Sequence, residues 1–345
     1  MGKDTVDLYD YFPIRAINEK LLLNGTLDVT AGYSLMLPEV YCMDEDTQEE
    51  IHKELTLLIK RIPVDGFIQF LGHYYQGPFN KEYSGPSALQ RQNFFHWQER
   101  PVLHAFTRCF VSFCNPSYQP KQTRSNLLSP LKGTRENFLK KAEARIKEFR
   151  AFLPSFENSF SSIHGMRVKR LGDDELRAAL YDYWSLRYES PVSAAAAGGK
   201  EIPDPDLADG YFKIGDQYVA IVSLSEEGDR LKTSQINRKL GRGFNGVEMP
   251  QGVLLPTSMV MPLTLGLPFN HLYSVGIRIL DNVAMESANS GIKTLGLEVQ
   301  KTMASKAAAL KLTAKEMFVT TLSEYHQQAC TVQSSVIIND NNLEQ

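Results

Sequence analysis

The segment from Met249 to Ile277 most constrains the fold, because it contains no Lys, Arg, Asp or Glu over a length that could cross a bilayer. Proline recurs every six residues within it, at Pro250, Pro256, Pro262 and Pro268. Each proline removes a backbone donor and clashes with a helical turn, whereas a spanning helix must satisfy its own backbone. A transmembrane helix is therefore excluded. Two interpretations remain: a buried irregular strand, or a partly exposed apolar surface that docks a partner or lies at a membrane face.

The first part of the chain carries clear strand and helix patterns. Apolar and polar residues alternate over 26–37, which predicts a half-buried strand. A helix is predicted next, because apolar side chains recur at steps of four, three and four residues from Ile51 to Ile62. Thr47 and Glu50 have the spacing of a capping box at its start, and Pro63 is expected to end it.

Further strands and helices are predicted from the same kinds of pattern. Strands are predicted over 67–75 and 103–113, separated by a polar loop that fills most of 76–92. A helix is expected from Thr134, a short strand over 166–171 and another helix from Asp173 or Asp174. The apolar face of the first of these helices comprises Phe138, Ala142, Ile146, Phe149 and Leu153. The fold class is therefore predicted to be α+β, with mixed or antiparallel sheets covered by helices.

The composition changes after residue 190. A run of alanine and glycine over 194–199, followed by two prolines, indicates a flexible linker. Strands are predicted over 218–224 and 273–279, and the last 60 residues are predicted to be helical, with a second capping box at Thr313 and Glu316. Three regions are expected: an N-terminal α+β domain over 1–190, a β-rich region over 191–282 that begins with the linker, and a C-terminal helical pair over 283–338.

No reaction is indicated by the charge or the motifs. The net charge of −3 excludes a polyanion binder that works by bulk charge. Gly241–Gly246 fits G-x-G-x-x-G, but no strand precedes it and no helix follows, and no Walker A loop is present. His73 and His104 lie on predicted strands without a third metal ligand. We therefore expect no catalytic, cofactor-binding or metal-binding residue here, and direct nucleic-acid contact is not expected.

The four cysteines are too sparse for a disulfide framework, and the polar N-terminus has no apolar signal region. A cytoplasmic location is therefore expected.

Several blocks of the sequence resemble one known family. They are Asp10-Tyr11-Phe12-Pro13-Ile14, the patterned strand that ends in Pro38-Glu39, the helix that ends in Ile62-Pro63, and the aromatic strand that ends in Tyr74-Tyr75. Phe95-His96-Trp97-Gln98-Glu99-Arg100-Pro101, leading into Phe110-Val111-Ser112-Phe113, continues the order. Together they resemble the N-terminal region of TraG-type ATPases of conjugative transposons, which belong to the type IV secretion ATPases that power DNA transfer. The resemblance covers most of the chain, and its motifs are structural rather than catalytic.

The resemblance implies a docking and assembly role at the inner-membrane channel, peripheral to the membrane. It implies that ATP and Mg²⁺ bind only in an ATPase domain that is absent from this sequence, and that the C-terminal helices lead toward that domain. The expected partners are membrane-channel components, the ATPase domain and further copies of the chain. The candidate partner-docking residues lie in the uncharged segment: Leu254, Met259, Leu265 and Phe269.

Two other functional classes stay open on the sequence alone. One is an independent enzyme whose site converges from distant segments, and it would collect His73, His104 or carboxylates in a deep pocket. The other is a nucleic-acid-binding module, whose affinity would fall steeply with salt.

Overall fold

The computed structural model describes residues 14–24, 27–38, 43–79, 85, 87–114, 134–186, 205–208, 211–224, 246–248, 254–256, 264, 267–282 and 330–340. A large antiparallel sheet lies at the centre, in the order β1-β2-β3-β5-β4-β12-β13-β9-β8-β7, with β6 paired beside β2 on β3. Its strands are β1 (Ile14–Asn18), β2 (Leu21–Asn24), β3 (Val29–Met36), β4 (Gly66–Pro78), β5 (Pro101–Phe113), β6 (Arg167–Arg170), β7 (Pro205–Ala208), β8 (Tyr211–Ile214), β9 (Gln217–Leu224), β12 (His271–Ile279) and β13 (Cys330–Asp340). A separate pair comprises β10 (Gly246–Glu248) and β11 (Leu254–Pro256).

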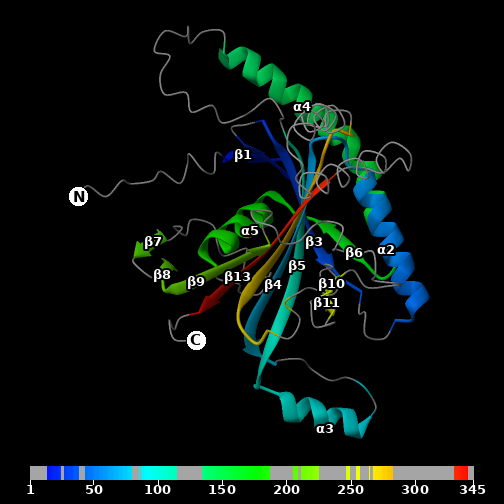
Figure 1. Cartoon of the computed structure of the whole chain (residues 1–345), viewed down its shortest axis with the longest axis vertical. Coiled ribbons are helices and arrows are strands. Elements are labelled where there is room, and N and C mark those ends of the chain that lie inside the picture. The colour runs from blue at the N-terminus through cyan, green and yellow to red at the C-terminus, as the bar shows by residue number, and fades with distance from the viewer. Residues whose placement is uncertain are drawn as a thin grey trace, which may run out of the picture.

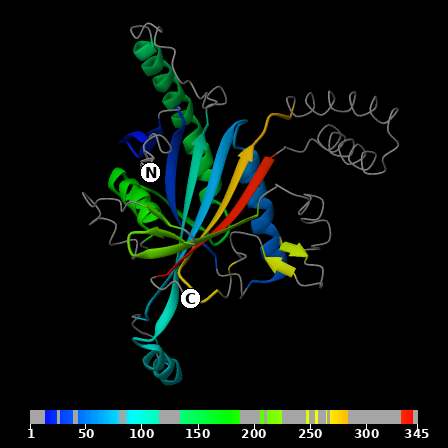
Figure 2. The same ribbon diagram turned by 60° about the vertical axis from the view of Figure 1, so that its left-hand side comes forward.

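Helices cover both faces of this sheet (Figures 1 and 2). α2 (Glu45–Lys60) and α4 (Thr134–Ser161) lie on one face, and α5 (Asp173–Ser185) lies on the other. The fourth described helix, α3 (Ala88–Trp97), lies away from the sheet. The predicted α+β class is therefore confirmed.

The larger core forms where α2 and α4 pack on the sheet. The alternation predicted for β3 is confirmed, because Val29, Ala31, Tyr33 and Leu35 are all buried on this face. Tyr33 contacts two phenylalanines of α4, Phe156 and Phe160, at ring-centroid distances of 6.0 and 6.1 Å. The phenylalanine-rich stripe of α4 therefore supplies much of the packing on this face.

The opposite face of the sheet accepts α5. Leu176 of α5 packs beside Gly32 of β3, where a Cβ atom would lie only 2.8 Å from the leucine Cδ2. Leu176 and Ala179 are buried in this smaller core with Leu171. A side chain at residue 32 would force the Leu176, Leu171 and Phe110 side chains to move, so glycine permits this close packing.

The start of α2 differs in detail from the prediction, whereas α5 begins at Asp173 as predicted. α2 is capped by Asp44, whose carboxylate accepts the Thr47 N–H at 2.8 Å, so the capping box expected from Thr47 begins three residues too late. α5 is capped at Gly172, whose N–H donates to the Glu175 carboxylate at 2.7 Å. In both cases the acidic residue satisfies a free backbone donor of the first turn.

The C-terminal helical pair is not supported. Cys330–Asp340 is the strand β13, which pairs with β12 on one side and β9 on the other. Val336 is buried on the sheet, and the β-branched residues near it favour extended backbone over helix. Residues 283–329, which include the rest of the predicted pair, lie outside the described residues.

Strands from early and late parts of the chain pair directly. β12 is hydrogen-bonded to β4, with His271 opposite Tyr74 and Arg278 opposite Phe67. β13 lies next in the sheet, and β9 follows it. The division of the chain into separate regions at residues 190 and 282 stays a prediction.

Candidate docking surface

β4 and β5 continue past their neighbours and form a two-stranded arm. β12 pairs with β4 as far as Tyr74, and β3 pairs with β5 as far as Thr107. Beyond these residues β4 and β5 pair with each other, ending with Pro78 opposite Pro101. Figure 1 shows that the arm leaves the body of the sheet and carries α3 at its far end. The predicted loop over most of 76–92 is thus partly wrong, because β4 reaches Pro78 and α3 begins at Ala88.

Side-chain contacts stabilise the arm, which needs them because an isolated two-stranded ribbon is marginal in water. The rings of Tyr75 and His104 stack across the strands at 5.2 Å between centroids, and Tyr75 meets Phe106 edge-on at 6.2 Å. The His104 Nε2 atom lies 3.1 Å from the carbonyl oxygen of Pro78. These cross-strand contacts hold the two strands together beyond the sheet.

α3 is fixed to the end of the arm. Phe94 packs edge-on against Phe79 at a centroid distance of 5.4 Å. The Phe79 N–H donates to the Arg100 carbonyl at 2.9 Å, and the Glu99 N–H donates to the Phe79 carbonyl at 3.1 Å. The Ser87 hydroxyl accepts the Gln90 N–H at 3.4 Å and caps the helix. The helix therefore has a defined position on the arm.

α3 exposes three large apolar side chains. The exposed fractions of Leu89, Phe95 and Trp97 are 71%, 72% and 49%, and none of the ten residues of α3 is buried. Burial of one such side chain would stabilise a complex by about 1.5–3 kcal/mol. Clustered exposed side chains of this size mark interaction surfaces, so the α3 end of the arm is the strongest candidate docking surface among the described residues.

This surface was missed by the sequence analysis. The first half of α3, the helix that contains Phe95 and Trp97, was predicted to be part of the loop over most of 76–92. Leu89, Phe94, Phe95 and Trp97 do not fall on one helical stripe, so periodicity gives no signal. The available signal was the N-cap Ser87, followed by ten residues without Gly or Pro.

A buried ion pair fixes α5 to the sheet near the base of the arm. Arg108 of β5 donates to the Asp182 carboxylate of α5 at 2.6 Å, and both residues are buried. The Arg108 guanidinium lies 4.9 Å from the centre of the Phe106 ring, and His73 stacks on the same ring at 4.4 Å. Burial, with a smaller contribution from the Arg108 charge, lowers the pKa of His73 well below its usual value. The arrangement favours a neutral imidazole beside a paired cation.

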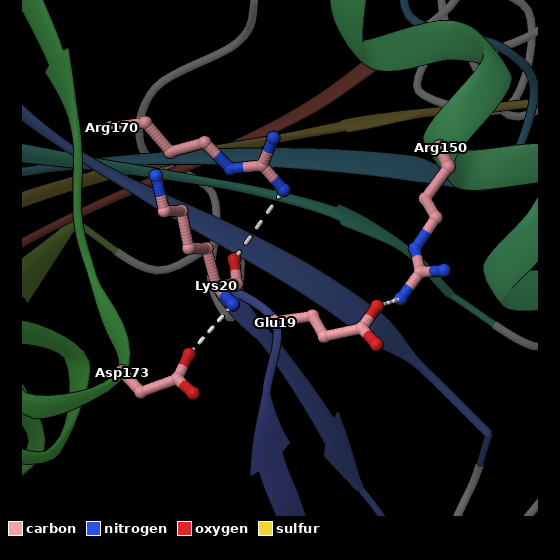
Figure 3. Close-up of polar contacts among 5 residues, drawn as sticks. All are labelled: Glu19, Lys20, Arg150, Arg170 and Asp173. Atoms are coloured by element: carbon pink, nitrogen blue, oxygen red, sulfur yellow. Dashed lines mark hydrogen bonds and ion pairs between the residues drawn. The ribbon is translucent and has the colours of Figure 1, made fainter.

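A second polar cluster holds the β1–β2 hairpin against two helices (Figure 3). Glu19 and Lys20 form its two-residue turn, and both have left-handed backbone with φ of 54° and 62°. The Lys20 N–H donates to the Asp173 carboxylate at 2.6 Å, and Arg170 donates to the Lys20 carbonyl at 3.5 Å. Arg150 of α4 pairs with the Glu19 carboxylate. These contacts fix a turn that non-glycine residues adopt at some cost.

The predicted docking residues lie in different places. Phe269 is half-buried and lines a cavity of roughly 470 Å³ with Gln76, Pro268, Asn270 and Asp340. Leu254 begins β11, opposite Glu248 of β10. Met259 and Leu265 lie outside the described residues. The docking role of these four residues stays a prediction.

The histidines expected on neighbouring strands are indeed on β4 and β5, but they have different environments. His73 lies opposite Phe106 and is buried, whereas His104 lies opposite Tyr75 and is half-buried. Within the described residues no group of three potential metal ligands comes together. Of the Gly241–Gly246 motif, only Gly246 is described, and it begins β10.

Compared with known protein families and with curated proteins, the chain matches no family model and no curated relative. Across the described ranges, the helices lack the combination of length and apolar character that crossing a bilayer requires.

Proposed function

We propose that the chain is a non-catalytic docking and assembly domain of a TraG-type conjugation ATPase, which takes part in DNA transfer by type IV secretion. The single observation that carries the docking role is α3, which presents Leu89, Phe95 and Trp97 to solvent at the end of the β4–β5 arm. The link to conjugation rests on the order of sequence blocks that resemble that family. In this proposal the full-length protein hydrolyses ATP, with ATP and Mg²⁺ bound outside this region.

The geometry supports docking because the arm separates the apolar helix from the main core. The β4–β5 ribbon is braced by Tyr75 and His104, and the Phe79–Phe94 contact sets the position of α3. A binding element that is already ordered loses less conformational entropy on association than a flexible loop does. The proposed partners are membrane-channel components of the conjugation machinery, the ATPase domain and further copies of the chain. The proposed location is the cytoplasmic side of the inner membrane.

Deletion of the gene tests the proposal directly. In the bacterium that encodes the chain, an in-frame deletion should abolish conjugative transfer of the element, and the intact gene supplied in trans should restore it. The readout is the number of recipients that acquire the element per donor. Normal transfer from the deletion strain would overturn the proposed role, as would rapid ATP hydrolysis by the purified 345-residue chain.

A further inference from the structure

We infer that the open edge of β9, from Ala220 to Leu224, binds an extended and uncharged segment of a partner protein, which joins the sheet there as a further strand. This stretch is the β9 edge. The inference deepens the proposed function and rests on it in one respect, because both treat the chain as a docking domain. The β9 edge is a second site, separate from α3.

One side of β9 lacks a partner strand along the β9 edge. β13 pairs with the other side of β9 from Tyr218 to Leu224. On the open side, β8 pairs only with Gln217–Val219. β8 begins at Tyr211, which already pairs back to Ala208 of β7, so β8 does not extend along the rest of β9. Among the described residues, no strand lies beside the β9 edge on this side.

The hairpin between β8 and β9 shows which backbone groups face the open side. Ile214 and Gln217 are paired across a two-residue turn in which Gly215 has a φ of 61°. The residues that flank such a tight turn exchange hydrogen bonds with each other, and this bonded arrangement recurs at every second residue along an antiparallel strand. The odd-numbered residues of β9 therefore direct their N–H and C=O groups away from β13.

Hydrogen bonding on β13 agrees with this direction. The Asn339 N–H donates to the Asn270 carbonyl at 3.1 Å, on the side of β12. The even-numbered residues of β13 therefore bond to β9, and each of them lies opposite an even-numbered residue of β9. The N–H and C=O groups of Ile221 and Ser223 are left at the open side, where an added strand would bond to all of them.

Other edges of the sheet carry features that discourage strand addition, and the β9 edge does not. Sheets commonly blunt their edges with proline, charge, bulges or very short strands. β7 has four residues and begins at Pro205, the β4–β5 arm ends with Pro78 opposite Pro101, and the β1–β2 pairing contains a register shift. The β9 edge reads Ala-Ile-Val-Ser-Leu, without proline, glycine or charge. Ile221 and Val222 point to opposite faces and are 60% and 59% exposed, so an apolar side chain is uncovered on each face.

The fold selects a single extended segment as the occupant rather than the same edge of a second copy. In a symmetric antiparallel pair of two β9 strands, β8 of one copy would lie in line with β9 of the other, beyond Leu224. β7 of that copy would then lie in line with β13, where residues 330–333 already stand. A strand without an attached hairpin has no such overlap. Because the β9 edge exposes apolar side chains on both faces, uncharged and β-branched residues fit the added strand best.

Peptide binding tests this inference. The probe is a fluorescein-labelled synthetic peptide of residues 217–224 with lysines added at both ends for solubility, which supplies an apolar strand without the β7–β8 hairpin. Its fluorescence anisotropy should rise and saturate as the 345-residue chain is added. Ser223→Pro should weaken the peptide Kd at least about tenfold, because proline removes an outward N–H and its ring obstructs the added strand. Ser223→Thr keeps the N–H and should leave the Kd unchanged.

A second pair of variants keeps the test decisive if Ser223→Pro does not fold, which circular dichroism shows. Ile221→Glu leaves the backbone intact and places a charge beside the added strand, so it should also weaken the Kd at least about tenfold. Charge repulsion cannot explain that loss, because the probe is cationic. Ile221→Val should bind as the wild type does.

Absence of saturable binding, or an unchanged Kd in the folded variants Ser223→Pro and Ile221→Glu, would overturn the inference. Self-association of the chain in sedimentation that Ile221→Glu abolishes, without any peptide binding, would also overturn it by identifying a second copy as the occupant. The transfer assay decides the proposed function separately. A chain that binds no peptide and still restores transfer to the deletion strain would remove this inference alone.

Discussion

The buried ion pair between β5 and α5 makes the sharpest prediction for stability. Arg108 and Asp182 are only 5% and 7% exposed, and their charged atoms are 2.6 Å apart. Asp182→Ala leaves the Arg108 guanidinium buried without its carboxylate, against the face of Phe106. Removal of one partner from a buried pair costs about 3–5 kcal/mol. At roughly 2–4 °C per kcal/mol, the expected fall in Tm is about 6–20 °C.

The same helix offers a matched control. Asp174 accepts from Arg177 at 2.7 Å, nearly the same distance, but the Asp174 side chain is 90% exposed. Asp174→Ala should therefore change Tm by less than about 4 °C, because an exposed pair contributes at most about 1 kcal/mol. The double variant Arg108→Met with Asp182→Leu should be more stable than Asp182→Ala, because it leaves no buried charge. Thermal unfolding followed by circular dichroism gives all three values. Equal Tm values for Asp182→Ala and Asp174→Ala would refute the claim that burial makes this pair important.

Two further perturbations test the packing of α5 and the state of the buried histidines. Gly32→Val should lower the free energy of unfolding, measured by urea denaturation, by about 1–3 kcal/mol, because the valine side chain would overlap Leu176. Unchanged stability would show that α5 does not pack this closely on β3. Burial lowers the pKa of both His73 and His271, so the unfolded chain takes up protons near pH 6.5 that the folded chain resists. The free energy of unfolding should therefore fall as pH decreases through about 6.5, by up to about 1.4 kcal/mol per pH unit for each histidine. His73→Phe should reduce this dependence of stability on pH. An identical pH dependence in the variant would contradict the account.

Sequence patterns predicted the elements whose apolar residues face a single core. β3 alternates cleanly because one of its faces packs against α4, and the α4 stripe that includes Phe149 and Leu153 is buried as expected. The strand β12 was likewise found from its alternating apolar residues. For β3 and α4 the period of the pattern matches the period of the structure, whereas β12 is buried over four consecutive residues from His271.

The elements and contacts that the sequence did not predict also have physical explanations. β13 was predicted as helix because the helical pattern upstream was extended into it, although Val332, Val336 and Ile338 have the spacing of one strand face. α3 gave no periodicity because it has no core to face. The pairing of Arg108 with Asp182 joins residues far apart in the sequence, so only the fold brings them together. The candidate docking surface therefore required the structure.

Conjugative transfer by strains with altered α3 tests the central claim most directly. The double variant Phe95→Ala with Trp97→Ala would be placed in the chromosomal gene, beside a control with Met36→Ala and Leu57→Ala, whose side chains are 59% and 60% exposed. With protein levels equal by immunoblot, the account predicts that transfer falls at least about tenfold for the α3 variant, in line with the apolar burial it loses, and stays at the wild-type level for the control. Wild-type transfer by the α3 variant would contradict the claim that this chain acts through its arm.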